Sequence, residues 1–577
     1  MKKVLRLLES LIFLITPVLI FILMESYEHN PFEEVRPEAV FFNILLFELL
    51  AWILLGIMGN GRRSLRVLSV LAMLFGITNH YVMAFRSTPF VPWDLLSVRT
   101  AASVAGNYDF TPDGRMIVVT LLFAGLIGGL HFLKPMEKGQ YTKRLRIAYG
   151  VLALASVCVL TGFAGRLQDE SFQNRHRLYP FLFTPAYMTK VNGMAVTFTM
   201  NLTYLKVDKP AGYRTEDAEA LLQQYAGEEK EKTDASYPNI IVIMDEAFSD
   251  LAVLGDVNAS EDYMPFVHSL QEGAQNTITG YLNVSVCGGN TADTEYEFLT
   301  GNTMRFLPAG SIPYQQYLKN ETPSLASYLT GLGYASYTLH PYYASGWERN
   351  RVYPLLGFKT SYFIENLNHP EYLRKYVSDK SDMEEIIHIY ENKEKGKPAF
   401  IFNVTMQNHG GYTDTYNNFR EDITAEGKDN ASLNQYLSLI KKTDEALEEL
   451  IAYFKEQEEP TILLFFGDHQ PNNAVAKSFS YQEDMLRYQV PYVIWANYDI
   501  PEQSGVDTSV NYLSTHLLDA AGVPRYDYQN FLARLEQYYP ILSAARQETA
   551  GAGNEELLAD YDKLQYYLLF DRKGETK

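Results

Sequence analysis

Five long apolar stretches lie before residue 165, and they limit what this chain can fold into more than any other feature of its sequence. They cover residues 5–24, 40–58, 65–85, 116–133 and 147–163. Each is close to the roughly 20 residues that a helix needs to cross a bilayer. Residues 1–165 are therefore predicted to form a membrane domain of five transmembrane helices. The first stretch follows basic residues and lacks a clear cleavage site, which indicates a retained anchor rather than a signal peptide.

The loops between these stretches predict how the domain is oriented. Basic residues precede the first stretch and recur at Arg62, Arg63 and Arg144, whereas the loop after the first stretch is acidic. Since basic loops remain in the cytoplasm, the N-terminus is predicted to be cytoplasmic. Five spans then place everything after residue 165 outside the cytoplasm. The chain is interpreted as a multi-pass protein of the cell membrane.

Composition excludes some classes of function. The net charge of −20 and the isoelectric point near 5.1 argue against a nucleic-acid partner. Two cysteines, Cys158 and Cys287, are too few for a disulfide framework or for a cysteine-rich zinc site.

From residue 238 to residue 545 the pattern changes to short apolar runs that alternate with amphipathic helices. The predicted strands are residues 240–244, 335–339, 399–405, 461–466 and 492–495. This alternation is typical of an α/β domain whose mostly parallel sheet is covered by helices on both faces. Residues 166–237 are predicted to be an extracytoplasmic connector, and residues 546–577 an acidic helical tail.

A glycine-rich stretch places one threonine, Thr291, at the start of a predicted helix. Gly288 and Gly289 permit a sharp turn, and Asn290 or Thr291 is placed to cap a helix over residues 292–299. A hydroxyl at a helix N-terminus also lies where backbone N–H groups attract a phosphate. Taken alone, the pattern favours a cap, because serine and threonine are ordinary capping residues.

Acidic and imidazole side chains that follow four predicted strands change that interpretation. They are Glu246, His340, His409, Asp468 and His469. Ligands of parallel sheets bind at the carboxyl ends of the strands, so these side chains are expected to meet at one edge. Two carboxylates, the Thr291 hydroxyl and the imidazole of His469 suit one divalent cation such as Mn²⁺, Mg²⁺ or Zn²⁺. Such an ion would activate Thr291 as a nucleophile, and Arg349 with the histidines would stabilise charge on a transferred phosphoryl or sulfuryl group.

Four motifs carry a resemblance to a known family. They are Asp245-Glu246-Ala247-Phe248, Gly289-Asn290-Thr291-Ala292-Asp293-Thr294-Glu295, Asn408-His409-Gly410 and Gly467-Asp468-His469. In this order, and after five apolar stretches, they resemble the lipoteichoic acid synthases, which are membrane-anchored members of the alkaline phosphatase and sulfatase superfamily. The resemblance implies a sulfatase-like catalytic domain for residues 238–545.

The resemblance also implies roles for particular residues. Thr291 matches the nucleophile of the family, and its metal ligands, usually for manganese, match Glu246, Thr291, Asp468 and His469. The family holds the glycerol phosphate group at the positions of His340, Trp347, Arg349 and His409. The implied reaction moves glycerol phosphate from phosphatidylglycerol onto Thr291 and releases diacylglycerol. The group then passes to a glycolipid anchor or to a growing polyglycerolphosphate chain of lipoteichoic acid, in a Gram-positive-type bacterium.

Three other functions stay open at this point. One is a sulfatase or phosphodiesterase of the same superfamily, although the residues from Cys287 to Thr291 do not match the sulfatase nucleophile motif. Another is a phosphoethanolamine transferase, which is similarly anchored and uses a threonine, but usually has more histidines and several disulfides. The third is a non-catalytic member that binds teichoic acid or a division partner.

Overall fold

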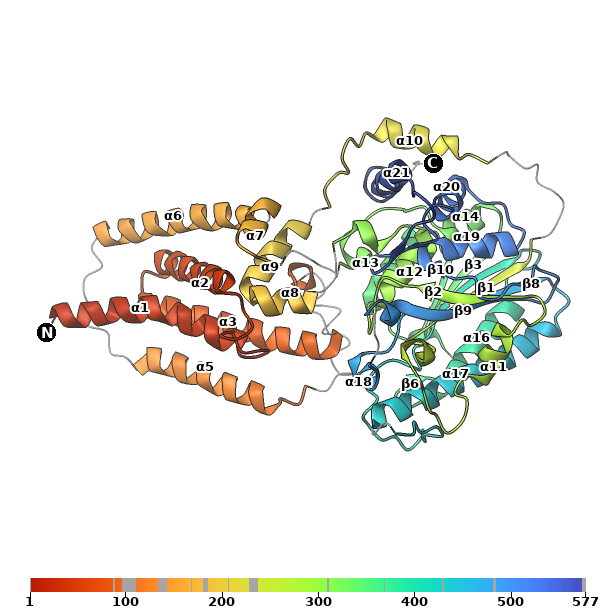
Figure 1. Ribbon diagram of the computed structural model, residues 1–577, viewed down its shortest axis with the longest axis horizontal. Coiled ribbons are helices and arrows are strands. Elements are labelled where there is room, and N and C mark those ends of the chain that lie inside the picture. The colour runs from red at the N-terminus through yellow and green to blue at the C-terminus, as the bar shows by residue number, and fades with distance from the viewer. Residues whose placement is uncertain are drawn as a thin grey trace. The chain divides into compact units, whose positions relative to one another are not determined.

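Long helices form the N-terminal unit of the computed structural model, and an α/β sheet domain forms the C-terminal unit (Figure 1). The N-terminal unit comprises Met1–Leu95 and Gly106–Lys206, and the C-terminal unit comprises Leu96–Ala105 and Val207–Lys577. The structure describes residues 2–86, 89–95, 110–132, 143–167, 169–179, 185–205, 207–227, 237–308, 311–367, 369–427, 430–480 and 484–572.

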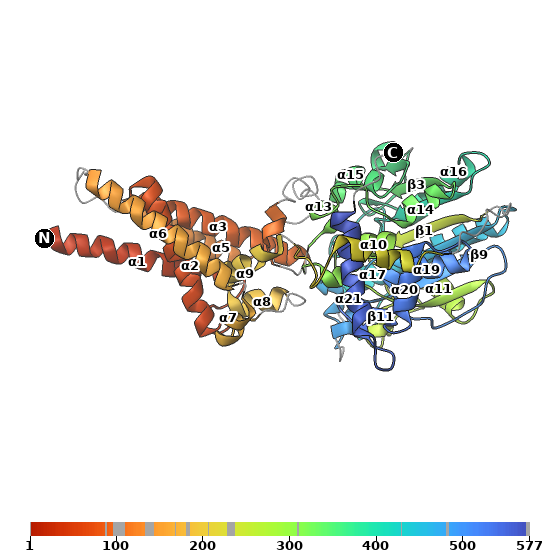
Figure 2. The same cartoon turned by 90° about the horizontal axis from the view of Figure 1, so that it is seen from above.

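Five long helices of the N-terminal unit follow the five apolar stretches and run alongside one another (Figure 1 and Figure 2). They are α1 (Lys2–Glu25), α2 (Pro37–Met58), α3 (Gly61–Arg86), α5 (Gly114–Phe132) and α6 (Lys143–Leu167). Within the described residues, the segments that are long and apolar enough to cross a membrane are Pro37–Met58, Gly61–Ala84, Gly114–Phe132 and Arg146–Leu167. Four predicted spans are thus confirmed by length and composition. The span predicted over residues 5–24 falls on α1 and stays a prediction.

Polar contacts attach short helices to these long ones. The short helices are α7 (Glu170–Arg175), α8 (Pro185–Asn192) and α9 (Met194–Asn201). The buried amide of Asn43 on α2 donates to the carbonyl of Asn192 at 2.7 Å and accepts from the N–H of Val196 at 3.0 Å. Gly193 lies between these contacts with φ 80°, and a Cβ there would lie 2.4 Å from the Asn43 amide nitrogen. Part of the predicted connector, residues 166–237, therefore packs within the N-terminal unit.

An eight-stranded sheet organises the C-terminal unit. Its strands lie in the order β10, β2, β9, β8, β1, β7, β3, β4. They are β1 (Asn239–Asp245), β2 (Thr277–Asn283), β3 (Ala335–His340), β4 (Thr360–Phe363), β7 (Ala399–Val404), β8 (Thr461–Gly467), β9 (Gln489–Ala496) and β10 (Thr508–Ser509). In this sheet β9 alone is antiparallel to its neighbours, β8 and β2. The predicted mostly parallel sheet is confirmed.

Alternate side chains of the strands enter two separate cores, one on each face of the sheet. On β1, Val242 and Met244 belong to one core, whereas Ile241 and Ile243 belong to the other. The first core is completed by α12 (Thr291–Thr300), α14 (Leu325–Gly331), α15 (Arg349–Leu355) and α19 (Val510–Ala520). The second core is completed by α11 (Pro265–Gln271), α16 (Asp379–Glu391) and α17 (Ala431–Lys455). Figure 1 shows these two groups of helices on opposite sides of the sheet, as the alternating sequence pattern predicts.

The apolar pattern does not predict β2, because polar residues interrupt its sequence. The strand nevertheless joins the sheet. Its backbone pairs with β9 and β10 and also with the loop of residues 503–506. The N–H of Thr279 donates to the carbonyl of Gln503, and the N–H of Val506 donates to the carbonyl of Thr279, both at 2.9 Å. A Cβ at Gly280 would lie 2.0 Å from the carbonyl oxygen of Val506, so this close approach requires glycine.

The C-terminal residues belong to the same unit as the sheet. Strand β11 (Ile541–Leu542) pairs with β12 (Gln547–Glu548) across the boundary predicted between residues 545 and 546. Helices α20 (Asp527–Glu536) and α21 (Glu555–Tyr566) pack with α10 (Thr215–Gln224), as Figure 2 shows from above. Gln565 pairs with both backbone groups of Thr303, at 2.8 and 3.0 Å. The predicted acidic tail therefore supports the chain just after α12. The remaining short elements of this unit are α13 (Pro313–Gln316), α18 (Asn473–Ala476), β5 (Tyr372–Leu373) and β6 (Tyr376–Val377).

Candidate active site

Two neighbouring parallel strands bring the predicted metal ligands to one edge of the sheet. In the register of β1 with β8, Asp245 lies opposite Gly467, so the two strands end at the same level. Glu246 directly follows β1, and Asp468 and His469 directly follow β8. A Cβ at Gly467 would lie 1.9 Å from the carbonyl oxygen of Phe248, so only glycine lets the turn after β1 approach the end of β8 this closely.

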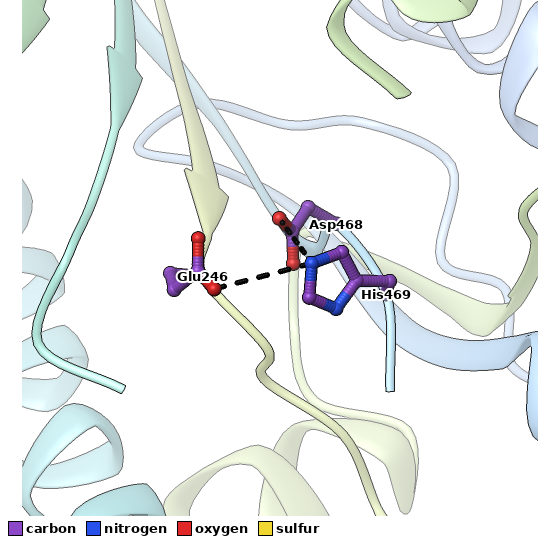
Figure 3. A group of neighbouring side chains, drawn as sticks. All are labelled: Glu246, Asp468 and His469. Atoms are coloured by element: carbon purple, nitrogen blue, oxygen red, sulfur yellow. Dashed lines mark ion pairs between the residues drawn. The ribbon is translucent and has the colours of Figure 1, made fainter. Parts of the chain in front are cut away.

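Glu246, Asp468 and His469 form a buried group, the carboxylate–imidazole group (Figure 3). One ligand atom from each residue lies within 4.8 Å of the other two. The Nε2 atom of His469 is 3.3 Å from Oδ2 of Asp468 and 3.9 Å from Oε1 of Glu246. Burial, and then the neighbouring Asp468 carboxylate, raise the pKa of Glu246 well above its usual value.

The hydrogen bonding of this group fits a divalent cation. The Nδ1 atom of His469 lies 2.9 Å from the carbonyl oxygen of Gln470, which can only accept, so Nδ1 carries a proton, and in the neutral imidazole Nε2 keeps its lone pair. Among the described residues, Nε2 of His469 and Oδ2 of Asp468 have no hydrogen-bond partner, although both are buried. Two lone pairs facing each other at 3.3 Å repel unless a positive charge lies near both. An imidazole nitrogen with carboxylate oxygens suits Mn²⁺, Mg²⁺ or Zn²⁺.

Thr291 is the first residue of α12, and its hydroxyl faces the carboxylate–imidazole group. Its Oγ1 donates to Oε2 of Glu246 at 3.2 Å. Asn290 occupies the cap position with a left-handed φ of 68°, but its side chain makes no capping hydrogen bond. The expected side-chain cap from Asn290 is therefore wrong. The left-handed turn of Gly288, Gly289 and Asn290 instead aims Thr291 at the strand ends.

A second buried group joins residues from three elements, and we call it the guanidinium cluster: Glu295 on α12, His340 at the end of β3, and Arg349 at the start of α15. Arg349 Nε donates to Oε1 of Glu295 at 3.0 Å, its Nη2 also pairs with that oxygen, and its Nη1 lies 3.0 Å from His340 Nε2. His340 Nδ1 donates to the carbonyl of Val404 at 2.8 Å, so Nε2 accepts from Arg349. Burial and then Arg349 lower the pKa of His340 well below its usual value, which keeps the imidazole neutral.

His409 and Trp347 complete the set of predicted site residues. Nδ1 of His409 lies 3.0 Å from the hydroxyl of Tyr376, and burial lowers the pKa of this imidazole to about 4 with help from the nearby positive charge of Arg374. Trp347 sits in the turn directly before Arg349 with a left-handed φ of 51°, and it is partly buried against the core on the α12 face. The structure therefore brings His340 and Arg349 into direct contact, whereas Trp347 joins them through the turn that it shares with Arg349.

Two residues without a role predicted from the sequence, Thr405 and Asn408, hydrogen-bond to Asp245, which directly precedes the predicted ligand Glu246. Thr405 Oγ1 donates to Asp245 Oδ2 and accepts from the N–H of Glu246, both at 3.1 Å. Asn408 Nδ2 donates to Asp245 Oδ1 at 2.9 Å. Burial and then Asp379 raise the pKa of Asp245 well above its usual value. Asp245 and Asn408 lie inside the recognised motifs, so their positions were visible in the sequence, but their partners were not.

Comparison with known proteins agrees with this geometry. The Sulfatase family model matches residues 238–523. A Rhizobium meliloti protein named for cyclic beta-1,2-glucan modification is 29% identical over 558 residues, which are 90% of this chain and 84% of that protein. The lipoteichoic acid synthase of Staphylococcus saprophyticus is 27% identical over 262 residues, 43% of this chain and 37% of the synthase. The chain thus spans well under half of the length of that synthase.

Two solved structures share the fold. The Streptococcus pyogenes phosphoglycerol transferase GacH, in complex with sn-glycerol-1-phosphate, aligns with a TM-score of 0.54 at 20% identity, over 63% of this chain and 96% of that one. The integral membrane protein lipooligosaccharide phosphoethanolamine transferase A of Neisseria meningitidis aligns with a TM-score of 0.53 at 14% identity, over 89% of this chain and 95% of that one. The second alignment extends through the helical unit.

These matches define a chain with the sulfatase fold in its C-terminal unit, and its N-terminal unit has helices that are long and apolar enough to cross a membrane. Residues 238–523 thus carry a Sulfatase domain, and the similarity to the lipoteichoic acid synthases supports the family resemblance seen in the motifs.

Proposed function

We propose that this protein transfers glycerol phosphate from phosphatidylglycerol to an acceptor hydroxyl through a covalent intermediate on Thr291. The observation that carries the proposal is the position of the Thr291 hydroxyl, 3.2 Å from Glu246 and at the N-terminus of α12. There it faces both the carboxylate–imidazole group and the partial positive charge of the helix N-terminus. A phosphate held at this point would meet a nucleophile and a stabilising dipole together.

The proposed metal ligands are Glu246, Thr291, Asp468 and His469. They would hold one divalent cation, most simply Mn²⁺, with Mg²⁺ and Zn²⁺ as alternatives that accept the same donors. When bound, the ion lowers the pKa of a coordinated hydroxyl and offsets negative charge on the phosphoryl group.

In the first step, the Thr291 oxygen loses its proton and bonds to the phosphorus atom of phosphatidylglycerol. The bond between phosphorus and the diacylglycerol oxygen breaks, and diacylglycerol leaves after taking up a proton. In the second step, an acceptor hydroxyl gives up its proton and attacks the same phosphorus atom, the bond between phosphorus and the Thr291 oxygen breaks, and that oxygen takes up a proton. Each step exchanges one phosphate ester for another.

Arg349, His409 and Trp347 are proposed to hold the glycerol phosphate group. Arg349 has five N–H donors, and Glu295 and His340 engage three of them, so it keeps donors for a phosphate. His409 is neutral at physiological pH, since its pKa is about 4, and it therefore offers hydrogen bonds rather than charge. Both ring nitrogens of His340 already bond within the protein, so its predicted contribution to substrate binding is indirect.

The acceptor is proposed to be a saccharide hydroxyl of the cell envelope. The relative that is named for glucan modification matches 90% of this chain, whereas the lipoteichoic acid synthase matches 43%. The glycolipid anchor and polyglycerolphosphate chain of lipoteichoic acid stand as the second candidate, supported by the synthase match. GacH, solved with sn-glycerol-1-phosphate, supports glycerol phosphate as the transferred group.

The proposed site of action is the outer face of the membrane. The basic loops predict a cytoplasmic N-terminus and an extracytoplasmic catalytic domain, residues 238–545, where lipid donor and envelope acceptor meet. A Gram-positive-type source was inferred from the family resemblance alone and stays a prediction.

The test uses the full-length protein in detergent with Mn²⁺ and phosphatidylglycerol labelled in its acyl chains. Release of labelled diacylglycerol by the wild-type protein, and its loss with Thr291→Ala or with a chelator, is the expected result. Thr291→Ala should keep the fold, because the helix start does not depend on its side chain. A Thr291→Ala protein that still releases diacylglycerol would exclude the covalent step. Release from phosphatidylethanolamine instead would favour a phosphoethanolamine transferase, and metal binding without turnover of either lipid would favour a binding protein.

A further inference from the structure

Glu295 is a buried acid that the proposed reaction does not use. It lies four residues after Thr291, so both side chains project from the same face of α12. Its carboxylate is fully buried, which is costly unless every charge is paired and hydrogen-bonded.

All of the contacts of Glu295 serve to hold it against Arg349. Its Oε1 accepts from both Nε and Nη2 of Arg349, and its Oε2 lies 3.3 Å from Nε, so the carboxylate engages two nitrogens of the guanidinium and limits its rotation. Its Oε2 accepts from the hydroxyls of Tyr353 at 2.8 Å and Tyr314 at 3.3 Å. Both tyrosines are fully buried, so the carboxylate has little freedom to turn.

The fixed guanidinium in turn sets the direction of the remaining donors. Arg349 presents Nη1 to His340 at 3.0 Å, and the carbonyl of Val404 holds the other side of that imidazole at 2.8 Å. The chain of contacts therefore runs from α12, which carries Thr291, through Glu295 and Arg349 to the ends of β3 and β7.

We propose that Glu295 is a positioning residue, which fixes the guanidinium of Arg349 relative to Thr291 because both acid and nucleophile stand on one rigid helix. This inference rests on the proposed function, in which Arg349 holds the transferred phosphate. The hydrogen bonds of Glu295 are to Arg349, Tyr314 and Tyr353 and to none of the proposed metal ligands among the described residues. A guanidinium that turned freely would still carry its charge, but its donors would no longer point at the phosphate as negative charge develops.

The experiment is a double-mutant cycle on the full-length protein in detergent with Mn²⁺. The variants are Glu295→Gln, Arg349→Gln and Glu295→Gln/Arg349→Gln, with Glu297→Gln as the matched control. Glu297 is also buried on α12, but its Oε1 bonds to Ser285, Thr303 and the N–H of Met304 rather than to Arg349. The kcat and KM of diacylglycerol release and the melting temperature are measured for each protein.

The expected result is a loss of kcat/KM of roughly 10- to 100-fold for Glu295→Gln, the size of a lost charge-assisted hydrogen bond, with most of the loss in kcat. Arg349→Gln and the double variant should agree within about threefold, because without Arg349 there is nothing for Glu295 to position. Glu297→Gln should keep wild-type kcat and KM.

Either of two results would overturn the inference: wild-type kcat/KM in Glu295→Gln, or a double variant at least tenfold less active than Arg349→Gln at a temperature at which both variants are folded. The double variant contains neither charge of the Glu295–Arg349 pair. Its activity therefore tests the inference even if Glu295→Gln folds poorly. If the wild-type protein releases no diacylglycerol, the proposed function fails, and the same cycle is then read from calorimetric binding of inorganic phosphate with Mn²⁺. Additive losses of phosphate affinity would then count against positioning, and non-additive losses would support it.

Discussion

The carboxylate–imidazole group follows β1 and β8, and the guanidinium cluster includes the end of β3, with β7 between β1 and β3, but the two groups are built in opposite ways. In the guanidinium cluster, the charge of Arg349 meets the charge of Glu295, and His340 is bonded at both ring nitrogens. In the carboxylate–imidazole group, the buried atoms Asp468 Oδ2 and His469 Nε2 have no hydrogen-bond partner among the described residues. The charges of one group are paired within the protein, and the other group is complementary to a cation.

This difference indicates how the two halves of the site would work. A paired guanidinium is preorganised, so it costs little to align when a phosphate arrives. A set of unbalanced acceptors costs folding energy until a cation offsets their repulsion, so metal affinity and stability are coupled.

Replacing Asp468 should have the largest effect on activity. In Asp468→Asn the side-chain oxygen can still accept from the N–H of Ala247, a contact of 2.7 Å in the wild-type protein, so the loop should keep its shape. One charged metal ligand is lost, and we expect diacylglycerol release to fall at least about 1,000-fold, since metal stabilisation is worth several kcal/mol.

The check is a comparison of turnover with metal-dependent melting. Saturating Mn²⁺, at 100 times its dissociation constant, should stabilise the wild-type protein by about 2.7 kcal/mol. Asp468→Asn should lose this shift, whereas the surface control Glu261→Gln should keep it. An undiminished Mn²⁺ shift in Asp468→Asn would remove Asp468 from the ligand set.

When stability rather than activity is measured, and no metal is present, we expect Arg349→Gln to have a larger effect than Asp468→Asn. Arg349→Gln leaves the Glu295 carboxylate buried without its cation, which should destabilise the C-terminal unit by about 3–5 kcal/mol. Asp468→Asn should be neutral or stabilising in a chelator, because it removes a charge beside Glu246 and supplies a donor to His469 Nε2. Thermal unfolding of the two full-length variants in EDTA tests this. Equal destabilisation by both would mean that the carboxylate–imidazole group is satisfied without a cation.

A paired network outside the site should show a smaller effect that depends on pH. Although burial alone would raise the pKa of Asp250, bonds from His268, Tyr263 and Tyr281 lower it to about 2. The carboxylates of Asp250 and Asp262 raise the pKa of His268 to about 9. Because the folded pKa of His268 lies above its usual 6.5, the stability it contributes is complete below pH 6.5 and is lost as the pH rises through about 9.

The measurement is the melting temperature of wild type and His268→Gln between pH 6 and pH 10. We expect the wild-type protein to lose about 1 kcal/mol more than the variant over this range, after allowance for the partial exposure of the imidazole. Parallel pH curves for the two proteins would show that the His268 ion pairs contribute nothing.

Much of the site could be predicted because strand ends are visible in a sequence. The apolar runs before Glu246 and Asp468 identify buried strands, and buried parallel strands must place whatever follows them at one edge. The glycines before Thr291 similarly indicate a tight turn into a helix. The roles of Glu295 and Thr405 could not be predicted, because their partners, Arg349 and Asp245, are far away in the chain.

The division into an apolar helical half and an α/β half, the positions of five strands and the ligand types at their ends follow from local periodicity and composition. Only the fold shows which strands are neighbours, that β2 joins the sheet, and that the residues after 545 support the chain just after α12. It also decided that His340 faces Arg349 rather than an open pocket. The physical reason is that each of these outcomes depends on pairing across long stretches of chain, where the satisfaction of buried polar groups and the close packing of backbones select one arrangement among many that the local pattern permits.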